Sequence, residues 1–379
     1  MSALPCAVGG WPAPARPGHS SRPHHSRPFR TGSASLSRAG LVVALAGLLV
    51  LSLAGPAQAH VIGVGGRASN YRTDVLDVTP PVPGLTVRVL EAGNQLALTD
   101  RSGQEVVVLG YRSEPYLRVG PTGVYENQRS PSSYANRFAN APRRIPPELD
   151  PAAPPQWHRI KRAPEAVWHD HRSHWSGPDP PAVTADRGHR QVVVPNWQIP
   201  LRLGQRIALI QGDIVWVPGP APWPWVLLAL VAFGVALAAG GRRQLALLAL
   251  LVGVAVAADV IHTVGAFAAS TAPVVAKVYA AMISVSGWVA AVVAVWQLRR
   301  GRLQAGRILL LLAGTFLAFA GALPDVGALA SSQLASTLDP VLSRATISLT
   351  LGLGLGMVAA SLLDQRTARP TTRPRGKAE

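Results

Sequence analysis

Three histidines lie close together in the short segment Trp168–Trp175, which is the densest cluster of polar and aromatic side chains in the chain. If this segment is a β-strand, His169 and His171 project from one face, and a turn brings His174 back to them. Neutral imidazole nitrogens are good ligands for Cu(II) and Zn(II). The spacing therefore predicts a metal site on these three side chains, with Asp170 pointing away from it.

The same histidines also fit a structural role, in which the imidazoles bond to backbone carbonyls and stack on Trp168 and Trp175. Other chemistry has less support in the sequence. The chain has no G-x-S-x-G or H-E-x-x-H motif, and its only cysteine, Cys6, lies near the N-terminus. We therefore expect no enzyme activity, and acid–base catalysis by these histidines is the least supported alternative.

His60 is a further candidate metal ligand because of its place in the chain. It follows Ala57-Gln58-Ala59, a small-x-small motif of the kind that signal peptidase cleaves, so cleavage makes it the first mature residue. A free α-amino group and an imidazole on one residue can chelate Cu(II). In this respect the chain resembles the periplasmic copper-binding sandwiches whose mature chains begin with histidine. The alternative is that cleavage simply leaves a histidine there.

Ionisable side chains also occur within strongly apolar segments further along the chain. Asp259 and His262 are three residues apart, which places them on one face of a helix, and Lys277 lies near the start of the next apolar segment. Charged groups inside a bilayer are costly, so these three are candidates for function. A structural Asp–His or Asp–Lys pair and a relay of protons or ions both remain open. Arg344 and Asp339 are expected to be interfacial anchors.

Five long apolar segments occupy the C-terminal part of the chain. A bilayer core about 30 Å thick needs about 20 residues of α-helix, and the segments are close to this length. The sequence therefore predicts a bundle of five transmembrane helices, at 223–240, 244–265, 274–298, 307–323 and 343–363. A lipid bilayer is thus the first expected partner.

Positive charge is concentrated in every second connection between these segments. Arginines occur in 241–243, in 299–307 and in the tail 364–379, whereas 268–273 is uncharged and 324–342 is acidic. Short connections rich in Lys and Arg stay in the cytoplasm, which predicts a plasma-membrane protein with its mature N-terminus outside and its C-terminus cytoplasmic. The formal net charge of +17 reflects this orientation and an attraction to anionic lipids, so no nucleic-acid partner is expected.

The N-terminal residues 1–59 have the features of a leader and signal peptide. Several arginines precede the apolar run 41–55, and the small-x-small motif follows it. An uncleaved sixth helix is the alternative, and it would leave the topology unchanged.

The region 60–222 is long enough to form one domain with its own core. Its short apolar segments alternate with turn residues, which is typical of an antiparallel β-sandwich. We expect a tight hairpin turn at Asp100–Gly103 and a long surface loop at 128–164, which is rich in Pro and Arg. Strands are expected at 84–91, 95–99, 105–111, 116–119, 124–126, 191–194, 197–203, 206–211 and 214–217. The predicted fold is α+β by segregated domains, with an extracytoplasmic β-sandwich followed by the five-helix bundle.

Three longer motifs, at 110–127, 168–175 and 212–224, resemble a family of uncharacterised multi-pass membrane proteins of high-GC Gram-positive (actinobacterial) bacteria. The resemblance extends over the mature chain and implies architecture only. Two hypotheses for function follow from the whole sequence. The domain binds or scaffolds an envelope protein or polymer, or the protein handles copper or zinc through the histidine cluster and His60.

Overall fold

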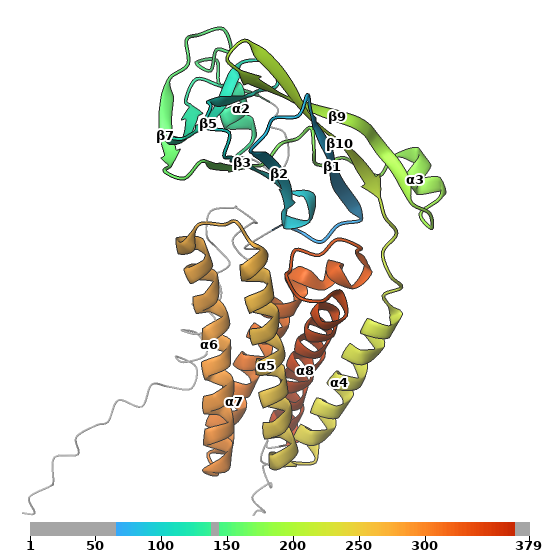
Figure 1. Cartoon of the computed structure of the whole chain (residues 1–379). Coiled ribbons are helices and arrows are strands. Elements are labelled where there is room, and N and C mark those ends of the chain that lie inside the picture. Colours follow the sequence, from blue (N-terminus) through green and yellow to red (C-terminus); the bar gives the residue numbers. More distant parts are fainter. Residues whose placement is uncertain (1–65, 138–143, 368–379) are drawn as a thin grey trace, which may run out of the picture. The chain divides into compact units, whose positions relative to one another are not determined.

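The computed structural model describes residues 66–137 and 144–367 (Figure 1). Ten strands lie between Tyr71 and Trp216, and every strand is antiparallel to its neighbours. Five helices long and apolar enough to span a membrane follow in the described residues. The fold is therefore α+β with segregated domains, as predicted. His60 and the predicted leader 1–59 lie outside the described residues.

The ten strands form two sheets. The larger sheet has seven strands in the order β1-β10-β9-β4-β5-β6-β7, and the smaller has three in the order β2-β3-β8. The two longest strands, β9 and β10, run side by side (Figure 1). The strand bounds are β1 Tyr71–Thr79, β2 Leu85–Leu90, β3 Gln95–Asp100, β4 Val106–Leu109, β5 Pro115–Gly120, β6 Gly123–Asn127, β7 Trp157–Lys161, β8 Glu165–Trp168, β9 Gln191–Leu203 and β10 Arg206–Trp216.

Both sheets contribute side chains to one hydrophobic core. Leu96 and Leu98 come from β3 of the smaller sheet, and Leu117, Ile199 and Ile210 come from the larger sheet; all five are at most 2% exposed. Alternation along each strand places such residues on its inner face. Each buried leucine or isoleucine stabilises the fold by about 1.5–3 kcal/mol. The domain is therefore sandwich-like, with its core between two sheets.

The expected hairpin at Asp100–Gly103 is wrong. β3 pairs with β2 and β8, whereas β4 pairs with β5 and β9, so the chain crosses from one sheet to the other at this turn. The turn itself does form at these residues, since Asp100 Oδ1 accepts hydrogen bonds from the Ser102 backbone N–H (2.8 Å) and hydroxyl (2.6 Å). Gly103 has the expected positive φ of 73°. Turn residues specify a reversal of the chain, but they do not specify which strands pair.

Two other hairpins connect strands that the sequence predicts. β5 and β6 meet at the turn Gly120–Gly123, where Gly123 has a φ of 114°. β9 and β10 are joined at Gly204, which has a φ of 59°. The expected separate strands 191–194 and 197–203 are one continuous strand, because Pro195 is accommodated at an irregularity in the β9–β10 register.

The prediction of a long surface loop at 128–164 needs correction. The short helix α2, Pro131–Ala135, begins at Ser130, whose hydroxyl accepts a hydrogen bond from the Ser132 backbone N–H. Strand β7 then pairs with β6 at the edge of the larger sheet. A second short helix, α3, spans Pro181–Ala185. β7 carries few buried side chains, so alternation of apolar residues could not reveal it. Strands β1 and β8 were also missing from the expected set.

The helices confirm the five predicted membrane-spanning segments, which makes this a multi-pass membrane protein. Many side chains on their outer faces are apolar and exposed, as lipid contact requires. The helices are α4 Trp223–Gly241, α5 Leu245–Ala269, α6 Val274–Arg299, α7 Leu303–Thr315 and α8 Pro340–Thr367.

Small residues allow α8 to pack closely against its neighbours. A Cβ added at Gly352 would lie 2.2 Å from the Ala229 carbonyl oxygen of α4, and one at Gly356 would lie 2.6 Å from Ala236 Cβ. On the α7 side, a Cβ at Gly314 would lie 2.5 Å from a backbone oxygen of α8. Such close approach is the usual basis of helix association in lipid.

The fourth predicted helix, 307–323, differs most from the structure. α7 begins earlier, at Leu303, and continues beyond Thr315 as the π-helical segment η2, Phe316–Ala322, and the 3-10 segment η3, Leu323–Ala330. Gly321 lies in η2, and a Cβ there would be 2.3 Å from Asp259 Oδ1. Interruptions of this kind are frequent at functional sites, and this one lies against an ionisable side chain.

Candidate functional site

The three clustered histidines follow a strand rather than lying within one. β8 ends at Trp168, and the next residues form a turn in which the Ser173 backbone N–H donates to the Asp170 carbonyl (3.1 Å). The Ser173 hydroxyl donates to the same carbonyl (3.1 Å). The turn, and not strand alternation, therefore positions the imidazoles.

The turn brings the three imidazoles together. The ring centroids of His169 and His171 are 4.6 Å apart, and those of His169 and His174 are 5.2 Å apart, both in edge-on arrangements. His169 Nε2 lies 3.3 Å from His171 Nδ1. His169 is therefore the centre of the cluster.

Backbone carbonyls fix the protonation of two of these rings. His169 Nδ1 lies 2.6 Å from the Asn94 carbonyl oxygen, and His171 Nε2 lies 3.3 Å from that of Ala135. A carbonyl oxygen can only accept, so both of these nitrogens carry a proton. In two neutral rings, the lone pairs of His169 Nε2 and His171 Nδ1 then face each other. A cation between them, either a proton or a metal ion, would remove this repulsion.

The distance between the facing nitrogens also suits a metal ion. Two nitrogens that each lie about 2.05 Å from one tetrahedral ion are about 3.3 Å apart. Metal-bound histidines usually donate their other N–H to a carbonyl, as both rings do here. In the described residues, however, no group of three or more His, Cys, Asp or Glu side chains is arranged to hold a metal ion. The site of His169, His171 and His174, with His60, stays a prediction.

Burial favours the neutral form of His169 and His174. Desolvation lowers the pKa of His169, although the hydrogen bond to the Asn94 carbonyl opposes this effect. Desolvation and the neighbouring His169 lower the pKa of His174 to about 4, against a smaller opposing effect of a backbone hydrogen bond to Gly93. Neutral imidazoles are the form that binds a metal ion.

Asp170 organises the turn and is not directed at the histidines. Its carboxylate is fully buried and accepts from the Arg172 guanidinium at both oxygens, Nε to Oδ1 (2.9 Å) and Nη2 to Oδ2 (2.8 Å). The Trp168 indole N–H donates to Oδ2 (3.0 Å). The Arg172 guanidinium lies over the Tyr111 ring, and the Tyr111 hydroxyl accepts from the His171 backbone N–H (3.0 Å). Asp170 is therefore a structural residue of this cluster.

The turn Glu91–Asn94 lies behind the histidines and also contacts the helices. It supplies the Asn94 carbonyl to His169 and the Gly93 backbone to His174. Glu91 Oε1 accepts from the backbone N–H and the hydroxyl of Thr271, both at 2.6 Å, in the connection between α5 and α6. Glu91 and Ala92 have positive φ values of 50° and 56°, an uncommon conformation for residues other than glycine.

A second polar group lies among the helices. Asp259 Oδ2 accepts from the Trp288 indole N–H (2.7 Å), while Asp259 Oδ1 is buried and has no hydrogen-bond partner. His262 Nε2 lies 2.9 Å from Asp325 Oδ2, and His262 Nδ1 is buried without a partner. The two residues predicted to share a helix face therefore bond to α6 and η3 and not to each other.

Lys277 and Arg344 both bind backbone carbonyls. Lys277 Nζ donates to the Phe267 (3.0 Å) and Ser270 (2.7 Å) carbonyls at the end of α5, so it caps that helix and does not pair with Asp259. Arg344 is 7% exposed and donates to carbonyls of the η3 region, including that of Ala328 (3.1 Å). Arg344 therefore binds the η3 region, and its role as an interfacial anchor stays a prediction.

Sequence reasoning missed three side chains of these groups, namely Tyr111, Trp288 and Asp325. A signal existed for two of them. A buried indole N–H needs an acceptor, so Trp288 in an apolar helix pointed to a polar neighbour. Asp325 follows directly after an apolar segment. Tyr111 joins the histidines through tertiary packing, and nothing in its local sequence indicates this.

Comparison of the chain with protein-family models, curated protein sequences and solved structures gives no match. The resemblance to a family of actinobacterial membrane proteins therefore stays a prediction.

Proposed function

We propose that this protein holds its sheet domain at the outer surface of the plasma membrane, where the domain binds an anionic partner of the cell envelope. The observation that carries the proposal is the exposed, basic edge strand β7, on a domain that is attached to the helices by specific contacts. The arginine-rich connections favour the orientation with this domain outside.

Several hydrogen bonds attach the sheet domain to the helical region. Ser69 and Gln333 form an antiparallel bridge, with N–H to O distances of 3.0 and 2.8 Å. Asn70 Oδ1 accepts from the Ser332 backbone N–H (2.8 Å), and Glu91 binds Thr271 at 2.6 Å. Contacts at two separate connections, α5–α6 and η3–α8, restrain rotation of the domain more than one flexible linker would.

Close packing reinforces this attachment. A Cβ at Gly219 would lie only 1.8 Å from the Ala330 carbonyl oxygen, so the chain between β10 and α4 lies directly against η3. Ala68 and Trp225 pack against the buried cluster that contains Leu329. This favours a domain held at the membrane surface over one carried on a tether.

β7 has the properties of a binding edge. It is the last strand of the larger sheet, and its residues from His158 to Lys161 are exposed on both faces. Ile160 is 51% exposed, an unusual position for an isoleucine. An edge strand presents backbone N–H and C=O groups to an added chain, and positive side chains attract a negatively charged one. Arg159 and Arg162 supply that charge, whereas Lys161 is paired with Glu165 (2.7 Å).

Binding to a soluble anionic polymer tests the proposal. We expect the full chain, in nanodiscs of uncharged lipid, to bind poly(glycerol phosphate) in a salt-sensitive manner and not to bind dextran. The double variant R159E/R162E should bind about tenfold more weakly, which corresponds to about 1.4 kcal/mol. The control R202E/R206E makes the same charge change on exposed positions of β9 and β10 and should remain within about twofold of the unmodified protein. Equal losses in the two variants would contradict a role of β7.

The orientation is tested separately. A single cysteine at position 302, R302C in a C6S background, should not react with an impermeant maleimide in intact cells, whereas a cysteine at exposed Arg206 should react. Labelling of position 302 from outside would place the sheet domain in the cytoplasm and remove the envelope as its site of action.

Metal handling is the second candidate function, and the facing lone pairs of His169 and His171 favour it. We expect full-length protein that is incubated with Zn(II) or Cu(II) and desalted to retain about one ion per chain, as measured by elemental analysis. H169A/H171A should lose this ion, while H158A/H189A, which alters two exposed histidines, should keep it. Equal metal content in the two variants would rule out the cluster as the site.

A further inference from the structure

A cavity of about 180 Å³ lies within the helical bundle, between the ends of several helices. It is partly open and is lined by residues of α4, α5, α6, α7 and α8 and of the α4–α5 connection. The lining residues are Gly240, Arg243, Leu245, Leu248, Leu298, Leu303, Arg307, Leu310, Ala360 and Ser361. The polar clusters described above contribute no residue to it.

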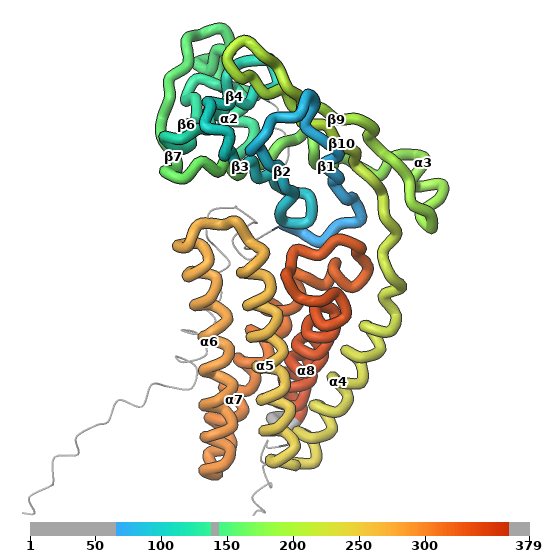
Figure 2. The backbone as a smooth tube through the Cα atoms, in the orientation of Figure 1, coloured from blue at the N-terminus to red at the C-terminus, as the bar shows by residue number. Residues whose placement is uncertain are grey.

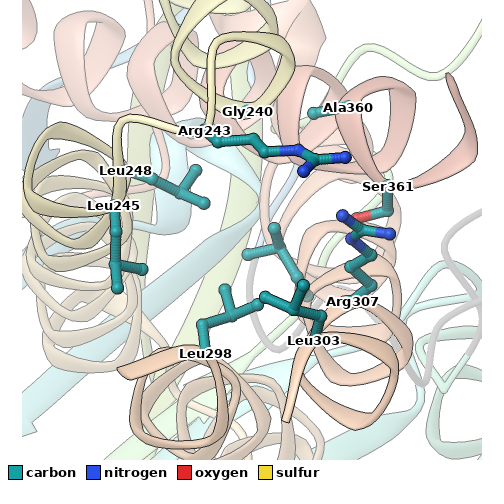
Figure 3. Close-up of a pocket in the computed structure, with 10 residues that line it drawn as sticks. Gly240, Arg243, Leu245, Leu248, Leu298, Leu303, Arg307, Ala360 and Ser361 are labelled. Carbon is teal, nitrogen blue, oxygen red and sulfur yellow. The ribbon is translucent and has the colours of Figure 1, made fainter. Parts of the chain in front are cut away.

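The lining has an apolar side and a cationic side. Figure 3 shows the side chains of Leu245 and Leu248 across the cavity from the guanidinium groups of Arg243 and Arg307, which approach the same place near Ser361. Leucine side chains favour a hydrocarbon chain. Arg243 and Arg307 each already take part in an interaction within the chain, but a guanidinium group has five N–H donors, so the donors that remain can bind phosphate oxygens. The lining therefore suits an amphiphile with an anionic head group.

The cavity lies at an arginine-rich end of the helical bundle, where anionic lipid head groups are attracted. The α4–α5 and α6–α7 connections occur at the same end of the bundle (Figure 2). Arg242, Arg300 and Arg302 lie in these connections in addition to Arg243, and Arg299 ends α6 beside them. Basic pockets between transmembrane helices are attractive to anionic lipid head groups, and this holds whichever side of the membrane that end faces.

One further feature supports an anionic ligand. α7 begins at Leu303, so its first N–H groups and the positive end of its dipole lie at the cavity.

The size of the cavity limits what it can hold. Ligand pockets for whole drug-sized molecules are about 300–1,000 Å³, and a cavity of about 150 Å³ holds one benzene-sized molecule. At about 180 Å³, this cavity accommodates the phosphate and the first part of an acyl chain, and the remainder of the molecule lies outside it along the helices.

We propose that this cavity binds one anionic phospholipid, with its phosphate between Arg243 and Arg307 and an acyl chain against the leucines. The site is independent of the β7 edge and of the histidine cluster, so it does not depend on either proposed function.

Native mass spectrometry of the full chain tests the proposal. Protein that is delipidated in detergent and then mixed with equal amounts of phosphatidylglycerol and phosphatidylcholine should retain one phosphatidylglycerol in preference to phosphatidylcholine. R243Q/R307Q should lose at least about tenfold in that preference, since two charge-assisted contacts are removed. R299Q/R302Q removes the same charge from residues that do not line the cavity, and it should keep the preference. Equal loss in both variants would show a diffuse attraction to the basic end and would overturn the site.

A second set of measurements separates a lipid from a free phosphate. Inorganic phosphate should not displace the bound lipid, whereas dodecyl phosphate should displace it. L303Q, at a position that is 47% exposed and so tolerant of a polar residue, should weaken dodecyl phosphate binding while leaving thermal stability unchanged. Displacement by inorganic phosphate at the same concentration as dodecyl phosphate would overturn the assignment to a lipid. Circular dichroism of R243Q/R307Q should match that of the unmodified chain; if this variant is unfolded, L303Q alone decides between the outcomes.

Discussion

Two buried carboxylates of the sheet domain, those of Asp170 and Glu114, are more fully hydrogen-bonded than that of Asp259 in the helical bundle. Asp170 binds both oxygens to Arg172 and one also to Trp168. Glu114 Oε1 accepts from the hydroxyls of Ser130 (2.8 Å) and Ser132 (2.7 Å). Asp259, in contrast, has one bonded oxygen and one buried oxygen without a partner.

This difference distinguishes carboxylates with a structural role from one that has an oxygen free to accept a proton or a donor. A fully bonded buried carboxylate holds its neighbours in place, and its loss is expensive. A buried carboxylate with only one hydrogen-bonded oxygen costs stability, because its other oxygen has no donor. That oxygen can accept a proton or another donor, and such groups in membrane proteins are commonly functional. Asp170 and Glu114 therefore hold turns of the sheet domain, whereas Asp259 in α5, like Asp100 of the sheet domain, has one buried oxygen without a hydrogen-bond partner.

The largest expected effect is that of removing Asp170. D170A leaves the Arg172 guanidinium without its partner in a mostly buried position, which should cost about 3–5 kcal/mol. With about 2–4 °C per kcal/mol for a domain of this size, the thermal midpoint of the purified full chain should fall by about 6–20 °C. A fall below about 2 °C would show that the carboxylate does not hold the turn.

Glu114 should show the next largest effect, and a pH dependence. Burial raises the pKa of Glu114, but hydrogen bonds from Ser132, Ser130 and the backbone N–H of Arg112 together hold it below its usual value. Because the folded-state pKa is lowered, this carboxylate stabilises the fold above the unfolded-state value, about 4.3, and the stabilisation is lost as the pH falls below it.

The substitution E114Q isolates that contribution. The amide group places a donor against an existing N–H donor, so E114Q should lose about 1–3 kcal/mol at pH 7. The difference between variant and unmodified chain should become smaller as the pH is lowered from 5 towards 3, as measured by thermal unfolding at each pH. A difference that is constant across this range would contradict the lowered pKa.

Asp259 should behave in the opposite way. D259N keeps an acceptor for the Trp288 indole and removes a charge from an apolar surrounding, so the thermal midpoint should stay unchanged or rise. W288F removes the donor and should destabilise by about 1–3 kcal/mol. Destabilisation by D259N as large as that by D170A would show that the two carboxylates contribute equally to the stability of the fold.

The smallest effect is expected at the exposed pair of His189 and Asp186. Their closest contact is 2.8 Å, and His189 has 81% of its side chain exposed. Exposed ion pairs contribute about 0–1 kcal/mol, so H189A should leave the thermal midpoint within about 2 °C. A fall of more than about 2 °C would show that the exposed Asp186 carboxylate contributes more to stability than its exposure predicts.

The sequence predicted the helices better than the strand pairing. Membrane helices are determined by length and apolar composition, and both are local properties. Strand pairing depends on which edges meet: the turn at Asp100–Gly103 has the residues of a hairpin but connects two sheets. The π-helical segment Phe316–Ala322 was also missed, because it arises where Gly321 approaches Asp259 from another helix.

The candidate sites were predicted in part. The Trp168–Trp175 motif correctly indicated that His169, His171 and His174 lie together, although a turn and not a strand gathers them. Their backbone partners could not be predicted, since a carbonyl such as that of Asn94 is the same in every residue type. The cavity near Arg243 could not be found either, because it needs the spatial arrangement of all five helices.

The turn Glu91–Asn94 has one further consequence. The carbonyl that orients His169 and the carboxylate that binds Thr271 are only three residues apart, on a backbone that positive φ values hold in a tight bend. One short bend of backbone therefore anchors both the α5–α6 connection, through Thr271, and the central imidazole of the histidine cluster.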